Sequence, residues 1–405
     1  MIRLLRCRPG TWLRNGGKVL GWMLLRASAQ VATLLLLTRL LGASDYGRLV
    51  VVISLAAFIT PLVGLGLSNV LLRNGARDPA NLPIYLGIAA RWWWRTLLPG
   101  LGLGLVLFLW LLPEGLPLLA GVAAIGAEVA ASSLADLRAR HRQAEHRIGA
   151  FGAINSGLPL LRLAMLAMLF LVLPDAGTES VLWVYTASSM FYMLFLLGAL
   201  QGLPRNGTGT EPMPASGGLP FTVAIVAVRL QSEFNKPILA HSAFWMAGTY
   251  NVAQRFVELA SMPLLALQEA LWPRLYADSH PTQALLRTGT WLLSLALACS
   301  AVLYVVAPVL PWLLGGDYAA SVDVLRMLAW LPLLQTLRAL LNVHVIHHRR
   351  MQWIGLGYAC GALVGVATLA LLVPHLGLHG AVVAAYASEV AMIAFLIAGT
   401  RSAEA

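Results

Sequence analysis

Long apolar segments recur along the whole chain, and they constrain its fold more than any other feature. Each is about 20 residues long, the length at which an α-helix crosses the hydrocarbon core of a bilayer. We count about twelve such segments by this criterion. They run over residues 18–41, 47–71, 90–112, 116–137, 150–173, 180–200, 219–241, 247–271, 286–311, 319–342, 352–373 and 378–398. The sequence therefore predicts an all-α integral membrane protein.

The composition argues against a soluble protein. Of the 405 residues, 59% are hydrophobic and only 11% are charged, whereas soluble domains carry about 25% charged residues. The net charge of +11 would suit nucleic-acid binding in a soluble protein. Here the basic residues gather in short loops between apolar segments. We therefore expect an anionic membrane surface or an anionic substrate, and no nucleic acid.

Charges in the loops indicate which side of the membrane each loop faces. If the N-terminus is cytoplasmic, the basic loops at Arg138–Arg147 and His347–Arg350 are cytoplasmic and the acidic turn at Asp175–Glu179 is outside. Arg48 is the main exception among the outer turns. This positive-inside pattern predicts an even number of spans with both termini in the cytoplasm.

The chain also shows a weak internal repeat. Tyr46 opens the second apolar segment and Tyr250 opens the eighth, and each segment leads to a basic loop. Parallel repeats of this kind are common in transporters. We predict an N-terminal six-helix bundle (residues 1–200) and a C-terminal six-helix bundle (residues 219–405). A cytoplasmic linker rich in Gly, Pro, Ser and Thr (residues 201–218) would join them.

Charged side chains inside the spans are candidates for a functional site, because each costs about 2.5–3.5 kcal/mol at the centre of a membrane helix. A cavity lined with arginine suits a diphosphate, since the guanidinium fork matches phosphate oxygens and stays charged when buried. We predict a substrate-binding anion site formed by Arg26, Arg162, Arg229 and Arg255. Two other cations, Lys236 and Arg338, lie near the ends of their spans and are expected to reach the membrane interface.

Four carboxylates within the spans are candidates for ion coupling: Glu128, Glu233, Glu258 and Glu389. They suit a coupling proton or sodium ion, and they suit equally a static role as partners of the arginines. Arg229 and Glu233, for example, are four residues apart and so share one helical face. The sequence leaves both roles open.

Motifs of a nucleotide-driven or metal-dependent enzyme are absent from the sequence. There is no glycine–lysine loop for ATP hydrolysis and no acidic-X-acidic motif for a nucleotide sugar. His347 and His348 lack a third ligand, and the three cysteines have no metal-site spacing. We predict no catalytic residue, no metal and no cofactor, with coupling to a proton or sodium gradient left open. The protein is not expected to be an enzyme.

Five motifs follow one another along the chain. They are TRLLGASDYG at Thr38–Gly47, VGLGLSNVLLR at Val63–Arg73, AGTYNVAQRFVELASMPLLALQEALWPRLY at Ala247–Tyr276, LLGGDY at Leu313–Tyr318, and HLGLHGAVVAAYASE at His375–Glu389. Each resembles the corresponding segment of the polysaccharide-unit or O-antigen-unit flippases, which belong to the multidrug/oligosaccharidyl-lipid/polysaccharide (MOP) exporter superfamily. The first motif is expected to form the tight outer turn between the first two membrane helices.

This resemblance implies two six-helix bundles that face each other in a V around a central cavity. It implies a transporter that flips an undecaprenyl-diphosphate-linked oligosaccharide from the cytoplasmic to the outer leaflet by alternating access. Such transport would serve the synthesis of a polysaccharide such as lipopolysaccharide O-antigen or exopolysaccharide. It also implies a bacterial inner-membrane location, contact with membrane lipids, and polysaccharide polymerase or export proteins as partners.

Three alternatives remain open at this point. A multidrug exporter of the same superfamily would line its cavity with acids for organic cations, whereas the charges within these spans lean basic. A membrane-embedded polysaccharide polymerase or ligase would carry a large outer loop, and every outer loop here is short. A non-transporting scaffold is excluded only by measuring activity. The sugar unit, the coupling ion and the oligomeric state are not specified by the sequence.

Overall fold

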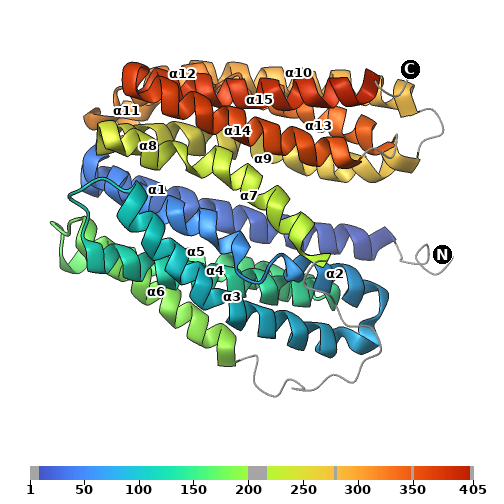
Figure 1. The fold of residues 1–405 in the computed structure, drawn as a ribbon, viewed down its shortest axis with the longest axis horizontal. Coiled ribbons are helices and arrows are strands. Elements are labelled where there is room, and N and C mark those ends of the chain that lie inside the picture. The colour runs from blue at the N-terminus through green and yellow to red at the C-terminus, as the bar shows by residue number, and fades with distance from the viewer. Residues whose placement is uncertain (1–8, 199–216, 278–280, 348–350, 402–405) are drawn as a thin grey trace. The chain divides into compact units, whose positions relative to one another are not determined.

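The computed structural model describes residues 9–198, 217–277, 281–347 and 351–401 (Figure 1). This part of the chain consists of helices joined by short turns and contains no β-strand. Nine helical stretches within it are long and apolar enough to cross a membrane. The predicted fold class, an all-α integral membrane protein, is confirmed.

The chain divides into two compact units, which are described separately. The N-terminal unit comprises Met1–Leu40, Leu55–Trp110 and Gly115–Val226, and the C-terminal unit comprises Leu41–Ser54, Leu111–Glu114 and Ala227–Ala405. Nearly all of the predicted linker, residues 201–218, lies outside the described residues. The division of the chain into six-helix bundles at residues 1–200 and 219–405 remains a prediction.

The N-terminal unit is organised around α4. Its helices are α1 (Pro9–Ile59, of which Leu41–Ser54 belongs to the C-terminal unit), α2 (Leu67–Arg77), α3 (Leu82–Leu111), α4 (Leu118–Ala144), α5 (Ile148–Val172) and α6 (Thr178–Gly198). α4 packs against α2, α5 and α6. Its buried residues include many small ones, such as Ala124, Ala127 and Ala131. Small residues let neighbouring membrane helices approach closely, so this composition suits a central helix.

The turn predicted at Thr38–Gly47 is a change of backbone direction inside α1, not a loop. Helical structure continues on both sides of Gly42, which itself has φ 70° and ψ 177°. Glycine adopts positive φ readily because it lacks a Cβ atom. A Cβ at Gly42 would also stand 3.0 Å from the carboxylate of Asp317. Both reasons favour glycine at this position.

The second predicted span, residues 47–71, is interrupted in the structure. α1 ends at Ile59, and α2 begins only at Leu67. Between them, Gly64 and Gly66 have positive φ, a conformation that ends a helix. The predicted length of this span was wrong because the apolar residues continue through the turn, whereas the helical backbone conformation does not.

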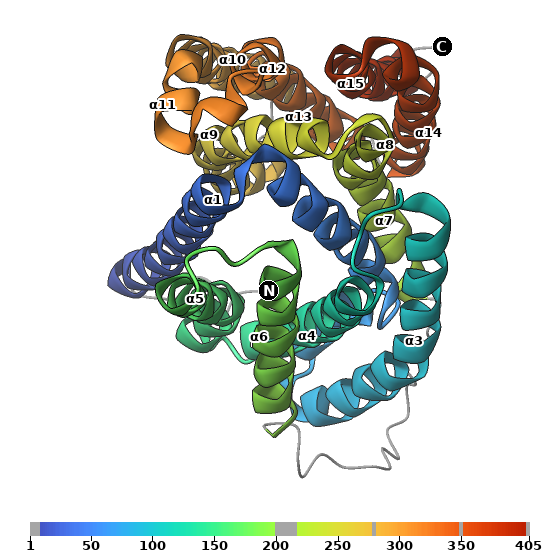
Figure 2. The same cartoon turned by 90° about the vertical axis from the view of Figure 1, so that its left-hand side faces the viewer.

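The C-terminal unit contains most of the remaining helices. In chain order these are α7 (Leu219–Glu233, which begins in the N-terminal unit), α8 (Asn235–Ser242), α9 (Phe244–Ala277), α10 (Pro281–Val306), α11 (Leu310–Leu314), α12 (Ser321–Leu328), α13 (Leu331–His347), α14 (Met351–Leu376) and α15 (Leu378–Arg401). α9 packs against α8, α10, α12 and α13, and α14 lies along α15 (Figure 2). Two predicted spans, 219–241 and 319–342, are each split into two helices.

Three of the five motif segments meet within the C-terminal unit. Asn251 Nδ2 donates a hydrogen bond of 2.7 Å to the hydroxyl of Tyr46. The Tyr46 ring packs edge-on against Tyr318, with ring centroids 6.4 Å apart. Gly47 and Gly248 bring α1 and α9 together, because a Cβ at either glycine would collide with the backbone of the other helix. The motif segments at Thr38–Gly47, Ala247–Tyr276 and Leu313–Tyr318 therefore form one packing centre.

Candidate functional site

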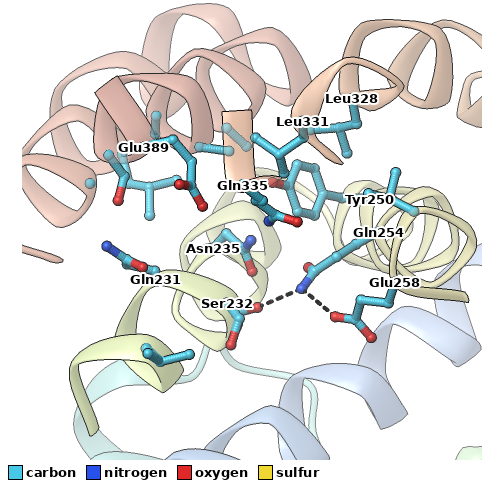
Figure 3. Close-up of a pocket in the computed structure, with 18 of the residues that line it drawn as sticks. Gln231, Ser232, Asn235, Tyr250, Gln254, Glu258, Leu328, Leu331, Gln335 and Glu389 are labelled. Atoms are coloured by element: carbon cyan, nitrogen blue, oxygen red, sulfur yellow. Dashed lines mark hydrogen bonds between the residues drawn. The ribbon is translucent and has the colours of Figure 1, made fainter. Parts of the chain in front are cut away.

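A cavity of about 160 Å³ lies inside the C-terminal unit, among helices α7, α8, α9, α12, α13, α14 and α15 (Figure 3). Its polar lining consists of Gln231, Ser232, Asn235, Tyr250, Gln254, Glu258, Gln335, Arg338, Tyr358, Ser388 and Glu389. Amide and hydroxyl groups outnumber charged groups in this lining. The cavity has apolar walls that carry these polar groups, and it is large enough to hold several water molecules, each of which occupies about 30 Å³.

A break in the seventh predicted span supplies part of this lining. Pro237 has no N–H, and in a continuous helix its ring would collide with the carbonyl of Glu233. α7 accordingly ends at Glu233, and α8 begins at Asn235. At the break, the carbonyl oxygen of Ser232 accepts a hydrogen bond of 2.7 Å from the Lys236 ammonium. A partly buried backbone oxygen next to the break therefore accepts hydrogen bonds from polar side chains.

Glu233 lies between two cations at this break. Its Oε2 is 2.6 Å from Lys236 Nζ, and its Oε1 is 3.3 Å from Arg229 Nη1. Lys236 is 1% exposed, whereas the Arg229 side chain is 46% exposed. The prediction that Lys236 reaches the membrane interface was wrong, because the Glu233 carboxylate and the Ser232 carbonyl bind its ammonium inside the unit.

Gln254 connects the break to a second charged pair on α9. Its Nε2 donates to the carbonyl of Ser232 at 3.2 Å and to Glu258 Oε1 at 2.9 Å (Figure 3). The other oxygen of Glu258 is 2.8 Å from Arg255 Nη1, and the side chains of this pair are 40% and 46% exposed. Glu258 and Arg255 thus form a half-exposed pair joined to the buried Glu233–Lys236 pair.

Glu389 on α15 has its own cation. Its Oε2 is 2.8 Å from Arg338 Nε on α13, and Arg338 also donates to the hydroxyl of Tyr358 on α14. The Arg338 side chain is 18% exposed, so it does not reach the membrane interface as predicted. These two partners link α13 to α14 and to α15.

Arg162 and Glu128 form a separate network inside the N-terminal unit. Arg162 on α5 pairs with Glu128 on α4 and donates a 2.9 Å hydrogen bond to the hydroxyl of Ser189 on α6. Ser189 in turn donates to Glu128 at 2.8 Å. The guanidinium also lies 4.1 Å from the ring centre of Tyr185, close enough for a cation–π interaction. Both charged side chains are only 12% exposed.

The predicted anion-site arginines are thus distributed over both units. Arg229 and Arg255 lie in the C-terminal unit, joined through Gln254 and the carboxylates. Arg162 is enclosed in the N-terminal unit, and Arg26 is exposed on α1 of the same unit. A single cavity surrounded by all four stays a prediction. Each predicted coupling carboxylate, in contrast, has a basic partner within its own unit: Arg162, Lys236, Arg255 and Arg338 respectively.

Two amide side chains at the cavity were not predicted as site residues. Asn235 Oδ1 and Gln254 Oε1 are buried, and neither has a hydrogen-bond partner in the part of the chain that the structure describes. Asn235 follows Gln231 by one helical turn, and this spacing was the available signal. Among the described residues no group of three or more His, Cys, Asp or Glu side chains is arranged to hold a metal ion.

No protein-family model and no curated protein matches the chain. Solved structures do. A multidrug resistance MATE family transporter of the MOP superfamily, in an inward-facing conformation, aligns with TM-score 0.72 at 14% identity, over 94% of this chain and 98% of that chain. The lipid II flippase MurJ, in an inward closed conformation, aligns with TM-score 0.75 at 10% identity, over 96% and 87%. The MATE multidrug transporter DinF-BH in complex with R6G aligns with TM-score 0.64 at 13% identity, over 98% and 96%. The chain therefore has the fold of MOP-superfamily transporters.

Proposed function

We propose that the protein is a membrane transporter that flips a lipid-linked oligosaccharide, carried on undecaprenyl diphosphate, from the cytoplasmic to the outer leaflet. The fold supports transport, and the solved structures of this fold include both a lipid flippase and multidrug transporters. The charge arrangement is the observation that favours the lipid-linked substrate. All four carboxylates predicted within the spans are bonded to basic side chains, so an organic cation would have to compete with a basic partner at each of them.

The half-exposed arginines are suited to the diphosphate of such a substrate. Arg229 and Arg255 each bind one carboxylate and keep nearly half of the side chain exposed. The five N–H groups of a guanidinium leave donors for phosphate oxygens after one carboxylate is bound. We infer that Arg229 and Arg255 contact the diphosphate, together with Arg26 and Arg162 when the cavity closes around it. A hydrogen bond to a charged group of this kind contributes about 1.5–3 kcal/mol.

Alternating access is the transport mechanism that this proposal adopts. Two bundles would rock about a central site, so that the site opens to each side of the membrane in turn. A coupling proton or sodium ion at Glu128, Glu233, Glu258 or Glu389 would first have to displace the basic partner described above. The proposal also includes a bacterial inner-membrane location with cytoplasmic termini, and polysaccharide polymerase or export proteins as partners.

Export of organic cations is the second candidate function, because two of the solved structures with this fold are MATE multidrug transporters. The two functions need opposite charge in the cavity. An organic cation would require a free carboxylate, whereas a diphosphate requires free cationic donors.

A reconstituted assay separates the two functions. The purified protein is placed in vesicles that contain undecaprenyl diphosphate bearing a fluorescent disaccharide, and dithionite added outside measures how much label has crossed. A panel of disaccharides is used, and rhodamine 6G uptake is measured in parallel. We expect label to cross with at least one disaccharide and rhodamine 6G to stay outside. Rhodamine 6G transport without any crossing of the labelled lipid would contradict the proposal.

A further inference from the structure

Lys236 is a charged side chain that lies wholly inside the C-terminal unit. It is 1% exposed, although it is only three residues from the end of a helix. Lysine side chains near helix ends in membranes normally extend to the interface, because a buried ammonium loses its hydration. An inward position therefore requires strong partners at the ammonium group.

Those partners are all oxygen atoms, and the helix break provides them. Glu233 Oε2 lies 2.6 Å from Nζ, and the carbonyl oxygen of Ser232 lies 2.7 Å from it. A carboxylate combined with backbone carbonyls at an interrupted helix is the ligand set with which many transporters bind a small monovalent cation. The Lys236 ammonium occupies the centre of such a set.

Two further buried oxygen atoms belong to side chains that line the cavity next to the break. Asn235 Oδ1 and Gln254 Oε1 are buried without a hydrogen-bond partner in the described residues, and both side chains line the adjoining cavity. Figure 3 shows Asn235 and Gln254 on the same side of the cavity as Ser232. The region around the break therefore offers more buried acceptors than Lys236 alone satisfies.

We propose that the break between α7 and α8 is a monovalent-cation site whose occupant is the ammonium of Lys236. The lysine takes the place of an alkali ion, so Glu233 is balanced without sodium or potassium. Arg229 does not fill this role, because it is half-exposed and reaches only the other carboxylate oxygen. Removal of the lysine side chain leaves a space next to the Glu233 carboxylate and the Ser232 carbonyl. The negative charge of that carboxylate suits a small external cation in this space.

The test measures thermal unfolding of the purified protein in detergent, by tryptophan fluorescence, in chloride salts of equal ionic strength. The cations are sodium, potassium, methylammonium and the bulky N-methylglucamine. We expect the melting temperature of the unaltered protein to be the same in all four salts. Lys236→Ala should melt lower in N-methylglucamine and recover by about 3 °C or more in methylammonium or sodium, with saturation as the cation concentration rises.

Two variants separate a filled site from a general salt effect. In Glu233→Gln/Lys236→Met both charges are gone, so no cation preference should appear. Arg142→Ala removes a cation from a partly exposed pair with Glu145 in the turn between α4 and α5, and it should also show none. The proposal would be overturned if sodium or potassium specifically raised the melting temperature of the unaltered protein. It would also be overturned if Lys236→Ala folded and melted at the same temperature in all four salts.

Failure of Lys236→Ala to fold in ordinary buffer is also decisive. In that case the variant is extracted in methylammonium or in sodium. Recovery of folded protein in either salt, but not in N-methylglucamine, supports a cation site. No recovery in any salt, while the double variant folds, overturns it. Because the measurement is unfolding and not transport, its outcome is independent of the substrate proposed above.

Discussion

The Arg162–Glu128 network and the Glu233–Lys236 pair each hold a cation and a carboxylate together inside one unit, but they are built differently. In the N-terminal unit, three unbroken helices, α4, α5 and α6, contribute one side chain each to a network of charges and a hydroxyl. In the C-terminal unit, one interrupted span contributes both charges and a backbone carbonyl. The first network depends on how helices pack, while the second is nearly complete within five residues of chain.

This difference indicates which network is suited to change. A pair shared by three packed helices resists movement, because any shift breaks several contacts at once. A pair at a helix break has a cavity beside it and a half-exposed cation, Arg229, next to it. We therefore expect the C-terminal break to move more than the N-terminal network when a ligand binds.

The largest effect is expected for Arg162→Ala. The variant leaves Glu128 charged, 12% exposed and without its guanidinium partner. Breaking one partner of a buried pair costs about 3–5 kcal/mol of the free energy of unfolding. Unfolding in mixed micelles measures this loss. The matched double variant Glu128→Leu/Arg162→Met should recover most of it, and equal destabilisation of single and double variants would show that the pair itself is not what stabilises the unit.

Arg255→Ala should reduce flipping strongly and stability little. Loss of one charged hydrogen bond to the diphosphate, about 1.5–3 kcal/mol, corresponds to roughly 10–100-fold in rate. The Arg255–Glu258 pair is about half exposed, so the free energy of unfolding should change by less than about 1 kcal/mol. Arg255→Lys should keep part of the rate, because the charge remains and the fork does not. Unchanged flipping in Arg255→Ala would remove Arg255 from the proposed site, and Arg142→Ala serves as the control for loss of a positive charge.

Gly248→Ala should destabilise the C-terminal packing centre by about 1–3 kcal/mol, because overpacking forces the backbone apart. The added Cβ would collide with the carbonyl oxygen of Ala43. Gly149→Ala is the matched control on α5 of the N-terminal unit, where a Cβ would meet nothing within 4 Å. It should leave the melting temperature unchanged or raise it slightly. Equal effects at the two glycines would show that the close approach of α1 and α9 contributes nothing.

The smallest effect concerns Glu145, in the turn after α4. Partial burial raises its pKa, but the hydrogen bond from Arg142 and the charges of His141, Arg142 and Arg147 outweigh burial and hold the pKa below the usual 4.5. A lowered pKa in the folded state means that the stabilisation is complete above the unfolded value and is lost as pH falls through the folded value. Arg142→Ala should therefore lower the melting temperature slightly at pH 7 and hardly at all near pH 3. A larger drop in melting temperature near pH 3 than at pH 7 would contradict the lowered pKa of Glu145.

The fold was largely predictable because its signals are local. Apolar length predicts where helices lie, and Gly42 marks the turn inside the first helix. The site was less predictable. The polar residues of the spans were visible, but Arg338 and Glu389 are 51 residues apart in sequence, and no spacing rule pairs them.

The order of residues alone predicts a membrane-embedded bundle of helices with more arginine than acidic residues inside its spans. The partner of each charged side chain became known only from the structure, because ion pairing depends on how helices pack and not on the order of residues along them. The inward position of the Lys236 side chain was likewise visible only in the structure. There its ammonium binds the Ser232 carbonyl oxygen and Glu233 Oε2 at the break before Pro237. Hydropathy averages over about 20 residues, whereas a buried cation is placed by two or three oxygen atoms within hydrogen-bond distance.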